Sequence, residues 1–153
     1  MNIASMAGKF NLPFMAYYSM SKSAVISFSH TLRREMKNSG VKLCTILPSS
    51  FQTKITSDDF IRDMAENKWR NTDESVQRVY GETPEIFVQK FLKVVNRFMF
   101  DSPVVDTVII DALRNEDPES TYVVTGSALV SLMDINTLVE PQAYQTFYQM
   151  VYR

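Results

Sequence analysis

The chain has one cysteine, four glycines and almost no net charge, and each shortage excludes a class of protein. The single cysteine, Cys44, excludes an internal disulfide, and its place in the apolar run Val41–Leu47 predicts a small buried hydrophobic residue. The 16 basic and 17 acidic residues nearly cancel and form no basic cluster, so we expect no nucleic-acid partner.

Two other kinds of segment are missing. The sequence contains no glycine-rich turn of the type that holds phosphate groups. Asp106 and Asp111 interrupt the most apolar late stretch, and the first residues lack the charged-then-apolar pattern of a signal peptide. His30 has no cysteine, histidine or carboxylate cluster near it in the sequence. We therefore expect no transmembrane segment, no secretion and no metal site.

What is present is enough apolar material for one domain. Of the 153 residues, 45% are hydrophobic, which is sufficient for a core. Asn2–Ser5 resembles the end of a strand, and Val41–Leu47 resembles a strand buried on both faces. Between them, Ala16–Lys37 predicts a long helix whose apolar face contains Val25, Phe28, Leu32 and Met36. The pattern indicates an α/β unit with a parallel sheet.

The later sequence continues with helices and one strand. The polar segment 56–75 predicts short helical pieces, and it is the best candidate for a mobile lid inside a wider substrate-lid region, 54–100. Pro84 can begin a helix, and Pro103 can begin another. The expected apolar faces of these two helices comprise Ile86, Phe87, Phe91, Leu92, Val95 and Phe98 in the first, and Val104, Val108, Ile109 and Leu113 in the second. A last strand is expected at Thr121–Thr125, and residues 127–153 are given no role.

Ser5, Tyr18 and Lys22 carry the chemistry that the sequence suggests. Residues four apart share one face of a helix, so the Lys22 ammonium would lie beside the Tyr18 phenol. A nearby cation favours the phenolate, which allows the phenol to exchange a proton with an alcohol or carbonyl oxygen. The Ser5 hydroxyl would hydrogen-bond that oxygen. Redox chemistry at a C–O bond is the function that this triplet favours.

The tyrosine–lysine pair alone is a short motif, and a surface pair on a helix is the alternative. Three parts of the sequence agree in their order, however. Ser5 precedes Gly8 in a loop that follows a strand, Tyr18 opens the long helix, and Pro48 ends the next strand five residues before Thr53.

These motifs resemble the C-terminal half of a short-chain dehydrogenase/reductase. The matching segments are Asn-Ile-Ala-Ser5-Met-Ala-Gly8, Tyr18-Ser-Met-Ser-Lys22 and Pro48-Ser-Ser-Phe-Gln-Thr53. The resemblance implies part of a Rossmann-like, doubly wound parallel sheet in three α/β/α layers, with its N-terminal strands missing from a single partial domain, 1–153. It also implies an NAD or NADP site. Tyr18 would be the acid/base, Ser5 would orient the substrate, and Lys22 would hold the nicotinamide ribose; Pro48, Ser49, Phe51 and Thr53 would lie at the nicotinamide end.

The resemblance extends more loosely to the retinol and hydroxysteroid dehydrogenases through Trp69 and the segment Tyr80-Gly-Glu. It implies a hydrophobic alcohol or ketone substrate, such as a retinoid or steroid, and a location in the cytoplasm or at the endoplasmic reticulum. The face of Ala16–Lys37 that carries Ser23, Ser27, His30 and Arg34 would contact a second subunit or solvent.

The chain departs from the family pattern in two respects. Ser49 stands where the family usually has glycine, and the family's glycine-rich turn would precede this region, so tight dinucleotide binding is not expected of this chain alone. A truncated, non-catalytic relative that acts as an interaction module is therefore the main alternative. An unrelated α/β module is a third. Mass spectrometry of the natural N-terminus would separate the first two.

Overall fold

A parallel sheet forms the centre of the computed structural model, which describes residues 1–10, 15–81, 83–97, 99–100 and 103–125. Its strands are β1 (Asn2–Ile3), β2 (Thr45–Pro48) and β5 (Thr121–Val124), in the order β1-β2-β5. Both neighbouring pairs are parallel. The predicted strand at Val41–Leu47 thus begins later, at Thr45, although the chain is already buried from Leu43. Residues 127–153 lie outside the described part.

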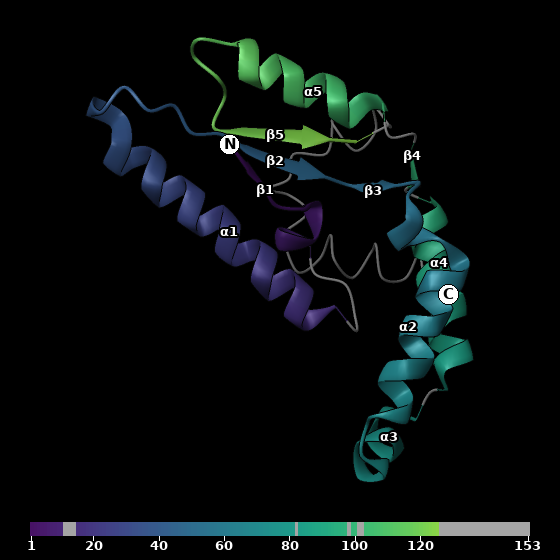
Figure 1. Ribbon diagram of the computed structural model, residues 1–153. Helices are drawn as coiled ribbons and strands as arrows, with labels where there is room; N and C mark the ends of the chain where they lie inside the picture. The colour runs from purple at the N-terminus through teal and green to yellow at the C-terminus, as the bar shows by residue number, and fades with distance from the viewer. Residues whose placement is uncertain (11–14, 82, 98, 101–102, 126–153) are drawn as a thin grey trace, which may run out of the picture.

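Helices cover both faces of the sheet, which gives three α/β/α layers (Figure 1). Helix α1 (Ala16–Glu35) covers one face and α5 (Pro103–Arg114) covers the other. Successive side chains of β2 lie on opposite faces of the sheet, because side chains alternate along a strand. Leu47 packs with Ile26 of α1, and Ile46 packs with Ala112 of α5. The expected doubly wound, partial Rossmann-like architecture is confirmed.

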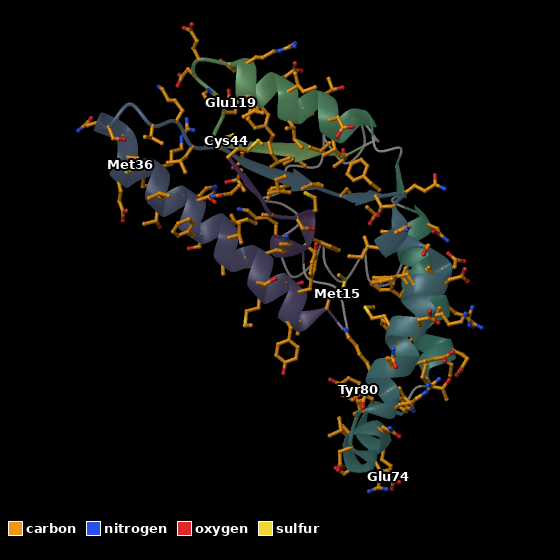
Figure 2. The ribbon with its side chains drawn as sticks, in the orientation of Figure 1. Met15, Met36, Cys44, Glu74, Tyr80 and Glu119 are labelled. Carbon is orange, nitrogen blue, oxygen red and sulfur yellow. The ribbon has the colours of Figure 1, made fainter. Side chains whose placement is uncertain are left out.

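Cys44 lies in the layer between α1 and α5 (Figure 2). Its side chain is only 5% exposed and belongs to the apolar cluster on the α5 side. The expectation of a small buried hydrophobic residue is therefore confirmed.

Helix α1 faces the sheet with small side chains. Its buried residues are Ser19, Ile26 and Ser29, whereas Phe28, which was expected in the core, is 59% exposed. That expectation was wrong because the sheet contacts another face of the helix, where the Asn2 side-chain amide donates to the Ser29 hydroxyl at 2.9 Å. The α-helix ends at Glu35, and a 3₁₀ turn (Met36–Asn38) follows it.

Part of the predicted polar face of α1 contacts its own chain. The Ser23 hydroxyl donates to the Gly8 carbonyl at 2.7 Å, and His30 Nε2 lies 3.2 Å from the Thr121 hydroxyl of β5. A few residues later, the Arg33 guanidinium donates to the carbonyl groups of Leu43 and Pro118. Ser23 and His30 thus contact the chain itself, which differs from the expectation for these two residues, whereas Ser27 and Arg34 of the same predicted face are exposed.

A helical arm connects β2 to α5. The short strand β3 (Ser50–Phe51) pairs with β4 (Met99–Phe100), and between them lie the helices α2 (Asp58–Arg70), α3 (Glu74–Tyr80) and α4 (Pro84–Arg97). Helices α2 and α4 pack together beside the sheet, with α3 at the far end of the arm (Figure 1). The short helical pieces predicted for 56–75 are mostly one 13-residue helix, α2.

The buried faces of the later helices differ from the predicted ones by a residue or so. Val88 of α4 is 1% exposed, whereas Ile86 is 43% exposed. In α5, Ala112 is buried, whereas Val104 and Leu113 are exposed. Apolar residues on most sides of these helices left several faces compatible with burial, and the neighbouring element decides among them. Among the described helices, none has both the length and the apolar character needed to cross a bilayer.

Candidate active site

The first and third sequence motifs meet at one edge of the sheet. Because β1 and β2 are parallel neighbours, their carboxyl ends lie side by side, and ligands of open α/β sheets bind at this edge. Ser5 follows β1, and Ser49 follows β2. The Ser5 hydroxyl donates to the Pro48 carbonyl at 3.5 Å, which is at the long limit of a hydrogen bond.

The second motif reaches the same edge through the first turns of α1. The Lys22 ammonium lies 5.7 Å from the centre of the Tyr18 ring, a distance typical of a cation–π contact. The same ammonium donates to the carbonyl of Ile3, the last residue of β1, at 3.5 Å. Tyr18 is 43% exposed, so its phenol ring is open to a ligand. Lys22 therefore connects the tyrosine to the strand that leads to Ser5.

Ser5 is held by a short turn. Its backbone is extended, its hydroxyl accepts from the Ala7 amide at 3.2 Å, and a 3₁₀ turn, Met6–Gly8, follows it directly. This turn packs against α1. Among the described contacts, no hydrogen bond joins Ser5 to Tyr18 or to Lys22, although the three residues come from adjoining elements.

The third motif is a tightly bonded backbone segment. The Ser49 amide donates to the last carbonyl of β5 at 2.9 Å, and the Phe51 side chain is buried in the core, so that motif presents mainly backbone there. Thr53 is exposed and its hydroxyl lies 3.3 Å from that of Thr56, which in turn donates to the Phe51 carbonyl at 2.7 Å. The structure thus places Pro48 and Ser49 beside Ser5, and Thr53 at the start of the helical arm.

Two features of the site were not found from the sequence. The carbonyl of Ile3 is a partner of Lys22, but a backbone carbonyl leaves no mark in a sequence. The hydrogen bond from the Ser23 hydroxyl to the Gly8 carbonyl is the second feature. Its only signal in the sequence is a serine directly after Lys22 and a glycine three residues after Ser5. Within the described residues there is no group of three or more histidine, cysteine, aspartate or glutamate side chains that could hold a metal ion.

The chain is similar to known dehydrogenases. Residues 1–63 match the family model described as short chain dehydrogenase. The chain is 38% identical over 125 residues to rat 17-beta-hydroxysteroid dehydrogenase type 6 and 32% identical over 122 residues to rat retinol dehydrogenase 7; each match covers 79% of this chain and 38% of the relative. It is 31% identical over 126 residues to rat mitochondrial D-beta-hydroxybutyrate dehydrogenase, a match that covers 79% of this chain and 36% of that protein.

A parallel sheet between helices, with a serine, a tyrosine and a lysine beside the carboxyl end of its first strand, defines an α/β protein of the doubly wound class. The family match and the relatives then identify the family: the chain belongs to the short-chain dehydrogenases/reductases, together with retinol and 17-beta-hydroxysteroid dehydrogenases. This is a family of NAD(P)-dependent oxidoreductases. The chain spans less than two fifths of the length of these relatives, 38% in the first two comparisons.

Proposed function

We propose that the chain supplies the catalytic half of an NAD(P)-dependent oxidoreductase that interconverts an alcohol and a carbonyl compound. The observation that carries the proposal is the position of the Lys22 ammonium, 5.7 Å from the Tyr18 ring centre and bonded to the end of β1. This contact holds a phenol, a group that can give or take a proton, at the edge of the sheet that also carries Ser5.

The proposed roles follow from what each side chain can donate or accept. In alcohol oxidation, the substrate hydroxyl proton passes to the Tyr18 oxygen, while the Ser5 hydroxyl donates a hydrogen bond to the same substrate oxygen. Carbonyl reduction is the reverse, with Tyr18 as the acid. A bound nicotinamide supplies the hydride acceptor or donor.

The residues present fit the nicotinamide end of a dinucleotide. The hydrogen-bonding groups are the Lys22 ammonium at the end of β1, the exposed hydroxyl of Thr53 at the start of the helical arm, and the backbone beside Pro48 and Ser49 at the end of β2. Lys22 would bind the ribose hydroxyls, and the third motif, including the Phe51 backbone, would bind the carboxamide. These groups serve NAD and NADP equally, because neither contact involves the adenine half.

A hydrophobic small molecule is the substrate class that we favour. Two of the relatives are named for retinol and for 17-beta-hydroxysteroids. The region 54–100 begins directly after the third motif and exposes two apolar side chains near its start, Ile55 and Phe60, which are 67% and 45% exposed. We propose that this region covers the substrate. We also propose that it forms one domain with the rest of residues 1–153.

Helix α1 also offers a surface for self-association. Tyr17, Met20 and Phe28 lie on one side of the helix and are 86%, 64% and 59% exposed. We propose that this stripe, the α1 stripe, pairs with that of a second copy, in place of the face with Ser23 and His30 that the sequence suggested.

The enzyme function is tested by spectrophotometry at 340 nm. The natural gene product is purified and incubated with NAD⁺ or NADP⁺ and with one of three substrates: retinol, a 17-beta-hydroxysteroid or D-3-hydroxybutyrate. We expect reduced nicotinamide to form with the first two substrates and more slowly with the small acid. If no substrate yields reduced nicotinamide and calorimetry detects no dinucleotide binding, the enzyme proposal fails and the non-catalytic interaction module gains support.

A further inference from the structure

Gly8 lies unusually close to the backbone of α1. A Cβ atom placed on Gly8 would be 2.8 Å from the carbonyl carbon of Lys22 and 2.9 Å from the amide nitrogen of Ser23. Real Cβ atoms do not approach main-chain atoms so closely, and helix backbone cannot swing aside as a side chain can. The glycine is needed here because of this close approach, since its φ is not among the positive values, which belong to Gly40 and Gly81.

The same contact carries a strong hydrogen bond. The Ser23 hydroxyl donates to the Gly8 carbonyl at 2.7 Å, and both residues are partly buried, so water competes poorly for the bond. From Gly8 the bonding continues to the serine of the first motif: the Gly8 amide donates to the Ser5 carbonyl at 3.0 Å, and the Ala7 amide donates to the Ser5 hydroxyl at 3.2 Å.

We propose that Gly8 and Ser23 form a clamp that fixes the turn carrying Ser5 against the helix carrying Tyr18 and Lys22, with Ser23 as a positioning residue. The hydrogen bond of the clamp reaches the helix at Ser23, the residue next to Lys22. It therefore joins the two halves of the site at the point where their relative position matters most. Misplacing a reacting group by about 1 Å can lower a rate by roughly 100-fold. The catalytic consequence rests on the proposed function, whereas the clamp itself does not.

The clamp is tested first without turnover. Amide hydrogen exchange is measured by NMR in the full chain, at Gly8 and Lys9, for Ser23→Ala, for Ser23→Thr and for the control Ser27→Ala, which removes an exposed hydroxyl one turn along the same helix. Loss of one net hydrogen bond predicts about fivefold faster exchange in Ser23→Ala. Ser23→Thr keeps the hydroxyl and should exchange like the wild type, as should Ser27→Ala. Unchanged exchange in Ser23→Ala would overturn the clamp.

Turnover supplies a second readout that a merely structural role would not give. In an active protein, Ser23→Ala should lower kcat about tenfold and leave KM for the alcohol unchanged, and Ser23→Thr should restore kcat. An unchanged kcat in Ser23→Ala, beside an active wild type, would overturn the positioning role. If the wild type has no activity while the exchange at Gly8 changes as expected, the proposed function fails and the clamp stands.

Discussion

Small and polar residues set the distance between α1 and the sheet. Ser29 and Asn2 bond to each other there, and Gly8 touches the helix backbone. The close approach of α1 to the sheet also buries polar atoms that have no hydrogen-bond partner. Within the described structure, the hydroxyls of Ser19 and Thr45 are buried and accept or donate no hydrogen bond. Such a group costs free energy, because in the unfolded chain water would bond it.

Thr45 and Thr121 allow this cost to be measured with a matched pair. They are register partners in neighbouring strands, but only Thr121 has a side-chain partner, His30. Thr45→Val should raise the free energy of unfolding by about 1 kcal/mol, because it replaces an unpaired hydroxyl by a methyl group. Thr121→Val should lower it by about 1 kcal/mol, because His30 loses its partner. Urea denaturation measures both values, and equal effects of the two variants would refute the explanation.

At the scale of elements, α3 depends on its ends. It is a seven-residue helix with no buried residue. Asp73 caps its start by accepting from the Ser75 amide at 2.8 Å, and Gly81, with φ of 66°, ends it. Hydrogen bonds from the Ser75 hydroxyl and then from the Ser75 amide hold the pKa of Asp73 below its usual value. The Gln77 side-chain amide also donates to the carbonyls of Trp69 and Thr72, at 2.7 and 3.0 Å, but a helix this short is marginal by itself and remains sensitive to its cap.

Acid should therefore unravel α3 first. A lowered pKa means that the charged Asp73 stabilises the folded form; this contribution is complete above the usual carboxyl pKa of about 4 and is lost as the pH falls through the lower folded value. NMR chemical shifts recorded from pH 6 to pH 2.5 should show α3 losing helicity before α2. Asp73→Asn keeps a capping oxygen that does not titrate, and should remove the difference. Equal acid sensitivity in both proteins would contradict this account.

The sequence was sufficient for the order of the main helices and strands, but it predicted neither the short strands β3 and β4 nor the buried faces of the helices. Turn signals around Gly40 and Pro48, and the three-to-four-residue spacing in Ala16–Lys37, predicted α1 and the strands on either side of it. Phe28 was misplaced because the apolar residues of α1 are compatible with more than one buried face, and the sheet packs on the face that carries Ile26 and Ser29.

The same limit applies to the candidate site. That Tyr18 and Lys22 lie together follows from helix geometry alone. The bonds from Ser5 to Pro48, from Lys22 to Ile3 and from Ser23 to Gly8 join distant segments, and two of them use backbone carbonyls of strands whose pairing had to be known first. The proposed roles of Ser5, Tyr18 and Lys22 remain predictions.

At the scale of the whole molecule, the proposed site lies at the edge where β2 gives way to the helical arm, while the α1 stripe faces outward. The far end of the arm, marked by Glu74 and Tyr80, lies well away from the sheet (Figure 2). A surface with several large exposed apolar side chains along one helix is typical of an interface.

Self-association through the α1 stripe makes a specific prediction. Light scattering with size-exclusion chromatography should give a dimer for the wild type and a monomer for Phe28→Glu, because a charge would be buried at the interface. Val79→Glu is the matched control: Val79 of α3 is 85% exposed but lies outside the stripe, so that variant should remain dimeric. A monomeric wild type, or a dimer that Phe28→Glu leaves intact, would rule out this interface.

The central claim is that Tyr18 exchanges the proton during alcohol oxidation. Its neighbour Tyr17 offers an internal control, since it is 86% exposed and loses the same hydroxyl in Tyr17→Phe. The deciding measurement is kcat for nicotinamide-dependent alcohol oxidation in the two single variants of the natural gene product. We predict a fall of about 10² to 10⁴ in Tyr18→Phe and little change in Tyr17→Phe. Equal kcat values in Tyr18→Phe and the wild type would contradict the account.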